Sequence, residues 1–502
     1  MGDIKIGLVV DNPYRDLPGM VLLARELALQ GACCHLIPYN LRDTEVWSLA
    51  PDFLLLNFLR KINEDWTLRL VEADLPFGVL DTEGSVFSPI PTWAVDDLAT
   101  AEHILDKNQP EIIDYLVTVA RKAEIRQSVA CYLAWSQGVK DFLVSHGLYN
   151  ANQVKVTGSP RTDMLTPRFR AAAQKISNYA EDYPKPLVLI NASFPTANPA
   201  FLTAQQEIDL MVKAFKYNRK FCEDSVKTQT VSLRGIARMA NDLAQAFPQA
   251  TFILRPHPFE STNTYTFLLD DRPNLKLIKM GTVDGWLQRA SALIQVGSST
   301  AVEASVLSVP VFTPGWLPLH VPVPVSTLAS VEAADIESMK SYLFKVLHNQ
   351  YEPTAEKKDQ IQQAIAQSYG PIDGLAYQRA AHEILAVCRS AKVQRNLNRC
   401  RTQLFFTMIS GPKWRRKLRA LTCSFGHLGI HWNWAKLKND YRKKLPWDQS
   451  EKRFDAVQTQ QILDAIETAQ PSGFRTVKAR QSMRADYHFG YREGRSVIIE
   501  SM

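Results

Sequence analysis

Several short motifs that mark common nucleotide-binding enzymes are missing from this sequence. The first apolar run, residues 4–10, is followed by Asp11-Asn12-Pro13-Tyr14-Arg15-Asp16 and not by a glycine-rich G-x-G-x-x-G turn, so binding of NAD or FAD is not expected. The G-x-x-x-x-G-K-[ST] pattern is also missing, which excludes a P-loop ATPase. The seven cysteines show no C-x-x-C spacing and no pairing with histidines, so they are expected to be reduced, mostly buried thiols and not zinc ligands.

Long hydrophobic runs are equally scarce. No apolar stretch approaches the ~20 residues that a membrane-spanning helix needs. The first residues enter a strand-like run almost at once and carry no basic segment followed by a separate apolar one, so they do not form a secretory signal. We therefore expect a cytoplasmic protein.

The positive charge of the chain is confined to one segment. The 502 residues carry a net charge of +7, with 46% hydrophobic and 22% charged residues, values ordinary for a globular protein too long for a single core. Residues 392–453 contain 16 Lys and Arg but only 3 Asp and Glu, whereas the remainder has 42 basic and 48 acidic residues. The main body is thus mildly acidic, and the basic segment forms a separate region.

Short apolar runs alternate with amphipathic helical patterns, which is typical of parallel sheets with crossover helices. Six strands are expected in the first half, at residues 4–10, 34–38, 52–58, 77–80, 130–135 and 154–157. Five more are expected further on, at residues 187–191, 251–254, 275–278, 292–295 and 309–312. These two series predict an α/β protein with two Rossmann-like domains that face each other across a cleft.

The domain boundaries follow from the same pattern. Residues 1–165 are expected to form the first domain, and residues 166–185, with prolines around a polar helix, form the linker. Residues 186–390 form the second domain. Residues 391–502 form a basic, mainly helical C-terminal appendage.

Two polar stretches at strand ends in the second domain predict a phosphate-binding site. Arg255-Pro256-His257-Pro258 ends one strand, and Gly297, Ser298, Ser299 and Thr300 lie between another strand and a helix. Backbone N–H groups at a helix start favour an anion, and open α/β sheets bind ligands at the carboxyl ends of their strands. His257 is expected to donate a hydrogen bond or proton to a leaving phosphate, with Arg255 beside it. The alternatives are a structural histidine and ordinary helix caps.

Further residues extend this predicted site. Glu303, one helical turn after Thr300, either binds a ribose hydroxyl or completes a capping box. Ser193 lies in the polar turn after residues 187–191 and is expected to contact the nucleotide. Arg161 either contacts the donor or pairs with Asp163.

The first domain offers carboxylates at a strand end. Asp81-Thr82-Glu83-Gly84 follows the strand at residues 77–80. Glu83 is the first candidate for a general base that takes a proton from an attacking hydroxyl, and Asp81 is the second. The alternative is that these carboxylates cap the next segment.

Five motifs in this order resemble those of bacterial surface carbohydrate biosynthesis proteins. They are Asp81-Thr82-Glu83-Gly84, Gly158-Ser159-Pro160-Arg161-Thr162-Asp163, Asn191-Ala192-Ser193-Phe194, Arg255-Pro256-His257-Pro258 and Gly297-Ser298-Ser299-Thr300-Ala301-Val302-Glu303-Ala304. They are similar to GT-B glycosyltransferases related to capsule Kdo transferases and bacterial sialyltransferases, over about residues 1–390. Position 85 departs from the pattern, with Ser where a second glycine is expected.

The resemblance implies a donor and a reaction. In those families the acidic-Gly motif supplies the base, and the His-Pro and Ser-Ser/Thr motifs contact the CMP phosphate. It implies transfer of a CMP-activated acidic sugar, such as Kdo or a sialic acid, onto a surface polysaccharide or lipid-linked glycan. Enzymes of this type need no metal, no Asp-x-Asp pair at a strand end suggests one here, and no cofactor is expected. The alternatives are a UDP-sugar epimerase of GT-B fold, a CDP-alcohol phosphotransferase and a non-catalytic binding protein of the polysaccharide machinery.

The basic segment at residues 392–453 mixes cations with aromatic residues, among them Trp414, Trp432 and Trp434. This composition suits an anionic membrane surface, where a lipid-linked acceptor would lie. It also suits packing of the aromatic residues onto the sheet domains, and nucleic acid is the less favoured partner.

Overall fold

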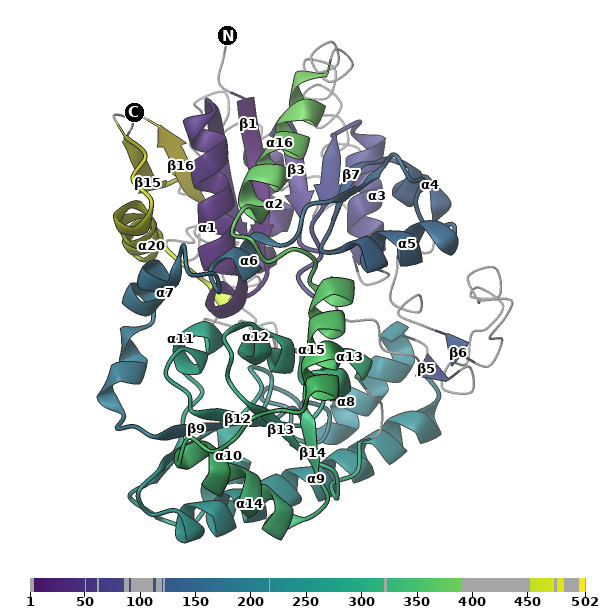
Figure 1. Cartoon of the computed structure of the whole chain (residues 1–502). Coiled ribbons are helices and arrows are strands. Elements are labelled where there is room, and N and C mark those ends of the chain that lie inside the picture. Colours follow the sequence, from purple (N-terminus) through teal and green to yellow (C-terminus); the bar gives the residue numbers. More distant parts are fainter. Residues whose placement is uncertain are drawn as a thin grey trace, which may run out of the picture. The chain divides into compact units, whose positions relative to one another are not determined.

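The computed structural model describes residues 4–49, 51–60, 63–84, 90–91, 112–113, 120, 122–215, 217–319, 323–390, 452–473, 476–482 and 496–501. The chain divides into two compact units (Figure 1). Unit 1 comprises Met1–Gly84, Ala120–Ala172 and Pro371–Met502, and unit 2 comprises Ser85–Val119 and Ala173–Gly370. Position 85 and residues 392–451 of the basic segment lie outside the described residues.

An eight-stranded sheet forms the centre of unit 1. Its order is β15-β16-β2-β1-β3-β4-β7-β8. The strands that run parallel are β1 (Ile4–Val10), β2 (Ala32–Pro38), β3 (Phe53–Leu56), β4 (Phe77–Val79), β7 (Val129–Ala134) and β8 (Val154–Val156). The strand order reverses between β1 and β3, since β2 lies on the other side of β1; such a switch point is where open α/β sheets bind ligands.

Helix α1 (Pro13–Leu29) crosses from β1 to β2 and is mostly buried. Asn12 caps its start by accepting the Tyr14 N–H, and Pro13 occupies a first-turn position where its missing N–H costs nothing. The amphipathic pattern of residues 18–30 predicts a helix that starts at Pro18, and the observed helix begins five residues earlier. The other helices of unit 1 are α2 (Arg42–Leu49), α3 (Glu64–Glu72), α4 (Ala123–Gln127), α5 (Gln137–Ser145), α6 (Pro160–Asp163), α16 (Ala376–Arg389) and α20 (Ala456–Ala469). Helix α7 (Arg170–Ile176) spans the division between the units.

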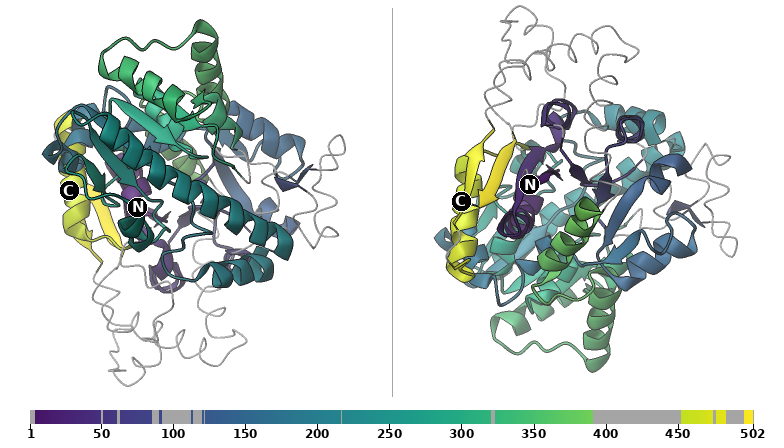
Figure 2. Two further views of the ribbon diagram at one scale, coloured as in Figure 1. Left: turned by 90° about the horizontal axis from the view of Figure 1, so that it is seen from below. Right: turned by 90° about the horizontal axis from the view of Figure 1, so that it is seen from above.

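The described part of the C-terminal region belongs to the first sheet. Strand β16 (Val497–Ser501) pairs antiparallel with β2, and β15 (Val477–Gln481) pairs antiparallel with β16. Figure 2 shows these yellow strands beside the purple ones. Main-chain hydrogen bonds to β2 therefore make the end of the chain an integral part of unit 1, where the sequence indicated a mainly helical appendage.

A six-stranded parallel sheet forms unit 2, in the order β11-β10-β9-β12-β13-β14. The strands are β9 (Leu187–Asn191), β10 (Thr251–Arg255), β11 (Leu275–Leu277), β12 (Ala292–Gln295), β13 (Val311–Pro314) and β14 (Val331–Ala333). Counted along the chain from β9, this is the 3-2-1-4-5-6 order of a doubly wound sheet, with its switch point between β9 and β12. A separate two-stranded pair joins β5 (Ile90–Pro91) to β6 (Ile112–Ile113).

Helices cover both faces of this sheet (Figure 1). On one face lie α9 (Arg219–Ala246), α10 (Thr262–Leu268) and α14 (Ile336–Leu347), and on the other lie α11 (Val283–Leu287) and α12 (Thr300–Val306). Also in unit 2 are the 3-10 helix at Asn178–Asp182, α8 (Ala204–Leu210), the π-helical turn at Met211–Phe215, α13 (Pro324–Leu328) and α15 (Ala355–Ser368).

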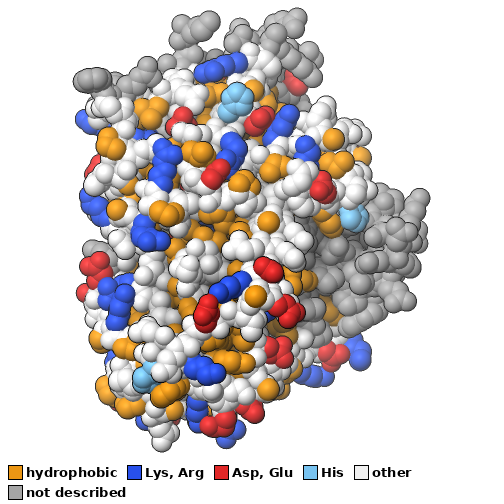
Figure 3. All heavy atoms as spheres, in the orientation of Figure 1, with side chains coloured by type: hydrophobic (Ala, Val, Ile, Leu, Met, Phe, Trp, Pro, Cys, Tyr) orange, Lys and Arg blue, Asp and Glu red, His pale blue; other side chains and the backbone are white. Residues whose placement is uncertain are grey.

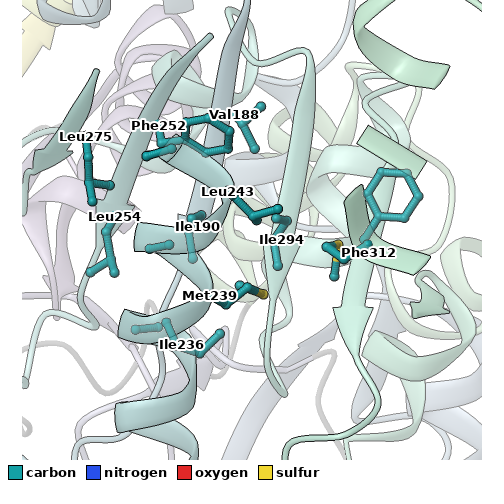
Figure 4. Packing of buried hydrophobic residues seen from close by; sticks show 14 of the residues in the cluster. Val188, Ile190, Ile236, Met239, Leu243, Phe252, Leu254, Leu275, Ile294 and Phe312 are labelled. Carbon is teal, nitrogen blue, oxygen red and sulfur yellow. The ribbon is translucent and has the colours of Figure 1, made fainter. Parts of the chain in front are cut away.

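Alternate strand residues of unit 2 pack against α9. Val188 and Ile190 of β9, with Phe252 and Leu254 of β10, meet Leu243 of the helix in a continuous buried cluster (Figure 4). Each of these side chains is at most 1% exposed. Because side chains alternate along a strand, the residues in between face α11 and α12.

The two sheets confirm the predicted α/β class with two Rossmann-like units. β14 was not predicted, because the helical pattern of residues 332–348 includes two of its three residues. Residues 371–389 were expected in the second domain but lie in unit 1, because α16 packs on α1 and the Asp163 carboxylate accepts the N–H groups of Ala376 and Tyr377 at its start. Five of the cysteines are within the described residues; all five are free thiols, and four of them are buried.

Within the described residues, no helix is both long and apolar enough to cross a membrane. Acidic and basic side chains are interspersed on the face drawn in Figure 3.

Candidate functional site

Three polar residues lie in one row across the carboxyl edge of the unit 2 sheet. Asn191 of β9 is in register with Arg255 of β10 on one side and with Gln295 of β12 on the other. The row therefore spans the switch point, and its side chains point to the face opposite α9. The predicted stretches at 255–258 and 297–300 leave the sheet at this edge, separated by β9. With adjacent strands ~4.8 Å apart, a single phosphorylated ligand can reach both.

The loop after β12 turns back toward this row. Gly297 has a positive φ of 61°, a conformation that glycine adopts without strain. The Ser298 hydroxyl lies 2.8 Å from that of Thr300 and accepts the Thr300 N–H at 3.3 Å. Asn191 Nδ2 donates to Thr300 Oγ1 at 3.1 Å, which joins the two strand ends of the switch point.

A ring of hydrogen bonds fixes the shape of the same loop. The Ser298 N–H donates to Gln295 Oε1 at 2.6 Å, and Gln295 Nε2 donates to Ser330 Oγ at 2.9 Å. Ser330 Oγ donates to the Ser326 carbonyl, and Ser326 Oγ donates to the Ser298 carbonyl, each at 2.7 Å. Gln295 is 1% exposed, so this ring is shielded from water. A role for Gln295 could not be predicted from the sequence, because its partner Ser330 lies 35 residues away, in the turn after α13.

Helix α12 does not use the expected cap. Its N-cap is Ser299, whose side chain makes no capping hydrogen bond, so the capping box expected from Thr300 to Glu303 is not its start. The Ser298 hydroxyl instead accepts the N–H of Thr300, the first residue of the helix. Glu303 is buried, at 1% exposure, within the first turn.

Arg255 is half-buried, and its Nε is buried with no hydrogen-bond partner among the described residues. Its Nη2 donates to the Gly281 carbonyl at 2.8 Å, and its guanidinium lies 5.8 Å from the centroid of the Trp286 ring. Burial lowers the pKa of Arg255 to about 10, against the weaker opposing effects of Tyr179 and Asp284. No carboxylate in the described part of the chain forms an ion pair with it. An anionic ligand could form an ion pair with this guanidinium.

The hydrogen bonding of His257 selects one tautomer. Its Nδ1 accepts the Phe259 N–H at 3.2 Å, which places the proton of the neutral ring on Nε2. The ring lies against that of Phe259, with centroids 5.5 Å apart. The carboxylate of Glu260 accepts the His257 N–H at 3.1 Å and the Phe194 N–H at 2.8 Å. Ser193, next to Phe194 and half-buried, is thereby held at the same edge.

In unit 1, both predicted carboxylates are engaged by arginines. Glu83, half exposed, pairs with Arg15 at 3.3 Å and Arg60 at 2.9 Å. Asp81 is 2% exposed, pairs with Arg60 at 2.8 Å and accepts the Glu83 N–H at 2.9 Å. Each oxygen of the Glu83 carboxylate accepts a hydrogen bond from one of these arginines. Sequence reasoning missed Arg15, in the first turn of α1, and Arg60, in the loop after β3, because only the fold brings them to the end of β4.

A small pocket lies at the carboxyl edge of the unit 1 sheet. Its wall includes Asp16, Asn57, Asp81, Trp135 and Arg161. Burial raises the pKa of Asp16, and the neighbouring guanidinium of Arg15 opposes the rise. Both strands of the switch point, β1 and β3, contribute to the wall.

Arg161 thus borders this pocket, while the carboxylate expected as its alternative partner is occupied elsewhere. Asp163 accepts the Ala376 N–H at 3.1 Å and the Tyr377 N–H at 2.8 Å. Burial raises the pKa of Asp163 to about 7 even though these hydrogen bonds lower it.

Within the described residues, no group of three or more His, Cys, Asp or Glu side chains is placed to hold a metal ion.

No protein-family model and no curated protein matches the chain. Among solved structures, a UDP-GlcNAc 2-epimerase from Neisseria meningitidis bound to UDP-GlcNAc is 13% identical, over 76% of this chain and 100% of that chain, with a TM-score of 0.45. A UDP-GlcNAc 2-epimerase from Methanocaldococcus jannaschii is 12% identical over 72% and 99%, with a TM-score of 0.43. A variant of the wall teichoic acid polymerase TagF is 10% identical over 78% and 90%, with a TM-score of 0.47. The strand orders given above, and not these similarities, establish the two Rossmann-like units.

Proposed function

We propose that this chain is a glycosyltransferase that takes a sugar from a nucleotide-activated donor, a CMP-linked acidic sugar, and transfers it to a surface polysaccharide or lipid-linked glycan. The observation that carries the proposal is the half-buried guanidinium of Arg255 beside the switch point of the unit 2 sheet: among the described residues, its buried Nε has no hydrogen-bond partner, and no carboxylate forms an ion pair with it. Removing part of a cation from water without an ion-pair partner is costly, and an anionic ligand would offset that cost.

The surrounding groups suit a phosphate that leaves. Departure of the nucleotide puts negative charge on a phosphate oxygen in the transition state, and donors already aimed at that oxygen lower the barrier. His257 offers an Nε2–H, because its Nδ1 is already an acceptor. The hydroxyls of Ser298 and Thr300 follow the carboxyl end of β12, three and five residues after Gln295, and lie 2.8 Å from each other.

Within the same proposal, unit 1 supplies the carboxylate that activates the acceptor hydroxyl. Glu83 is the first candidate and Asp81 the second. The anionic membrane surface proposed for residues 392–453 would hold a lipid-linked acceptor. Bound metal ions and cofactors have no role in this scheme, and the enzyme acts in the cytoplasm.

Binding measurements test the donor site directly. Isothermal titration calorimetry with CMP, CMP-Kdo, CMP-sialic acid, UDP-GlcNAc and CDP-glycerol is expected to show selective binding of the cytidine monophosphate compounds. Arg255→Met should weaken CMP binding at least tenfold, by loss of a charge-assisted hydrogen bond worth about 1.5–3 kcal/mol. Arg234→Met removes an exposed arginine of α9 in the same unit and should leave the affinity within twofold. Equal loss in both variants, or no binding of any compound by the folded wild type, would contradict the proposal.

Product analysis separates the rival activities. A UDP-sugar epimerase would release an epimerised sugar from UDP-GlcNAc without any acceptor, and a CDP-alcohol phosphotransferase would consume CDP-glycerol. A non-catalytic binding protein would leave surface glycan unchanged when His257 is replaced by Ala.

A further inference from the structure

We propose, resting on the function proposed above, that Glu260 is a positioning residue that holds two ligand-binding loops of unit 2 in one arrangement. The loops follow neighbouring strands: residues 192–200 follow β9, and residues 256–261 follow β10. Glu260 itself belongs to the second loop and reaches into the first. Its role is to place the His257 imidazole and the Ser193 turn together at the carboxyl edge of the sheet.

The carboxylate is the common acceptor of both loops. Its Oε1 accepts the Phe194 N–H at 2.8 Å and the His257 N–H at 3.1 Å. Its Oε2 accepts from Tyr265 Oη at 2.7 Å and lies 3.5 Å from Asn198 Nδ2. One side chain therefore connects the backbone of the first loop to the backbone at His257. Tyr265, which donates to the same carboxylate, belongs to helix α10.

Main-chain contacts continue the same junction. The Ala200 N–H donates to the Phe259 carbonyl at 2.8 Å, and the Ser261 N–H donates to the Asn198 carbonyl at 2.9 Å. The Glu260 N–H donates to the His257 carbonyl at 2.8 Å, which closes the turn that carries the histidine. Lys279 Nζ donates to the Glu260 carbonyl at 3.0 Å, so the segment after β11 also contacts this loop.

Because Glu260 is buried, the two N–H groups depend on its side chain for an acceptor. Glu260 has no exposed surface, so water cannot replace it at the two N–H groups. Truncating the side chain would leave both N–H groups without an acceptor, and the loops would move apart to reach solvent. Burial raises the pKa of Glu260, while the hydrogen bonds from Phe194, Tyr265 and His257 oppose the rise. The orientation of His257 Nε2 depends on the turn that this anchor closes.

The test compares three variants of the full chain. Glu260→Ala should weaken CMP binding at least tenfold, whereas Glu260→Gln, which keeps an oxygen for the two N–H groups, should restore the affinity to within threefold of wild type. Asn274→Ala is the matched control for stability. It removes a side chain that donates to the carbonyls of Ala244, Phe247 and Ala250 at the amino end of the strands, so it should lower the melting temperature without changing CMP affinity.

Histidine spectra give a readout that does not need a ligand. In ¹⁵N-histidine-labelled protein, the His257 ring signals, identified by their loss in His257→Asn, should show the Nε2–H tautomer in wild type and in Glu260→Gln. In Glu260→Ala they should shift to a mixture of tautomers. Unchanged ring signals in Glu260→Ala would overturn the positioning role. So would a loss of CMP affinity in Asn274→Ala as large as that in Glu260→Ala. If wild type binds no nucleotide, the proposed function fails, and the ring signals alone then decide the role of Glu260.

Discussion

The ion pair between Arg25 and Glu467 gives a quantitative prediction about how the end of the chain stabilises unit 1. Arg25 lies on α1 with its side chain 2% exposed, and its Nε donates to Glu467 Oε1 at 2.6 Å. Its Nη2 donates to the Gln470 carbonyl at 2.7 Å. Glu467 and Gln470 belong to the end of α20, so one buried guanidinium holds the C-terminal helix against α1.

The two partners should respond differently to substitution. Glu467→Gln leaves the Arg25 charge buried without a counter-charge and should cost about 2–3 kcal/mol, at the low end for buried pairs because Glu467 is 28% exposed. Arg25→Met removes the desolvated charge itself and lets Glu467 rehydrate, so it should cost less, roughly 0–2 kcal/mol. The double variant should resemble Arg25→Met, since the pair is already lost.

The pH dependence follows from the same pair. Burial raises the pKa of Glu467, but the hydrogen bonds from Arg25 and the Ser472 N–H outweigh it and lower the pKa overall. A lowered folded-state pKa means that the stabilisation is present above the unfolded-state pKa, near 4.3, and is lost as the pH falls through the folded value. Glu467→Gln should abolish this part of the acid sensitivity.

Hydrogen exchange is the suitable assay, because a chain of two units need not unfold in one step. Amides of α20 and β16 should exchange ~30-fold faster or more in Glu467→Gln than in wild type at pH 7, and less than this in Arg25→Met. Protection unchanged in Glu467→Gln, or a greater loss in Arg25→Met, would refute the reasoning.

Two further predictions concern backbone packing and a buried carboxylate in unit 1. A Cβ added at Gly19 of α1 would lie 2.5 Å from the Arg161 backbone nitrogen, so Gly19→Ala should lower the stability of unit 1 by about 1–3 kcal/mol, with Glu26→Ala on the same helix as control. A melting temperature equal to wild type would show that α1 and α6 can separate without cost. The raised pKa of Asp163, about 7, means that its folded form favours the proton, so wild type should lose stability as the pH rises from 5 to 8, by up to about 1.4 kcal/mol per unit below the folded pKa. Asp163→Asn should flatten that slope in thermal melts, and an unchanged slope would mean that another group causes it.

Most strand positions could be predicted from the sequence, because an apolar run that ends in polar residues has few alternatives in an α/β protein. The predicted limits of β1 and β9 agree with the structure. The start of α1 was predicted too late because Asp11-Asn12-Pro13 was assigned to a turn, whereas Asn12 and Pro13 provide the cap and the first turn. β14 was missed because three residues are too short for an alternation to be recognised.

Sequence reasoning could predict only part of the candidate site. Polar residues at strand ends identified Arg255, His257 and the loop after β12. The anchoring role of Glu260 could not be read, because its second partner, Phe194, is 66 residues away in the chain. The ion pairs of Glu83 with Arg15 and Arg60 were hidden for the same reason.

The order of apolar and polar residues by itself determined that this chain forms two parallel α/β units with polar loops at the strand ends, because burial of apolar faces and the backbone's need for hydrogen bonds act locally. Tertiary structure alone decided which strands are neighbours, that β15 and β16 complete the first sheet, and which charges meet. Hydrogen bonds between strands and ion pairs between side chains depend on distances that the linear order of residues does not contain.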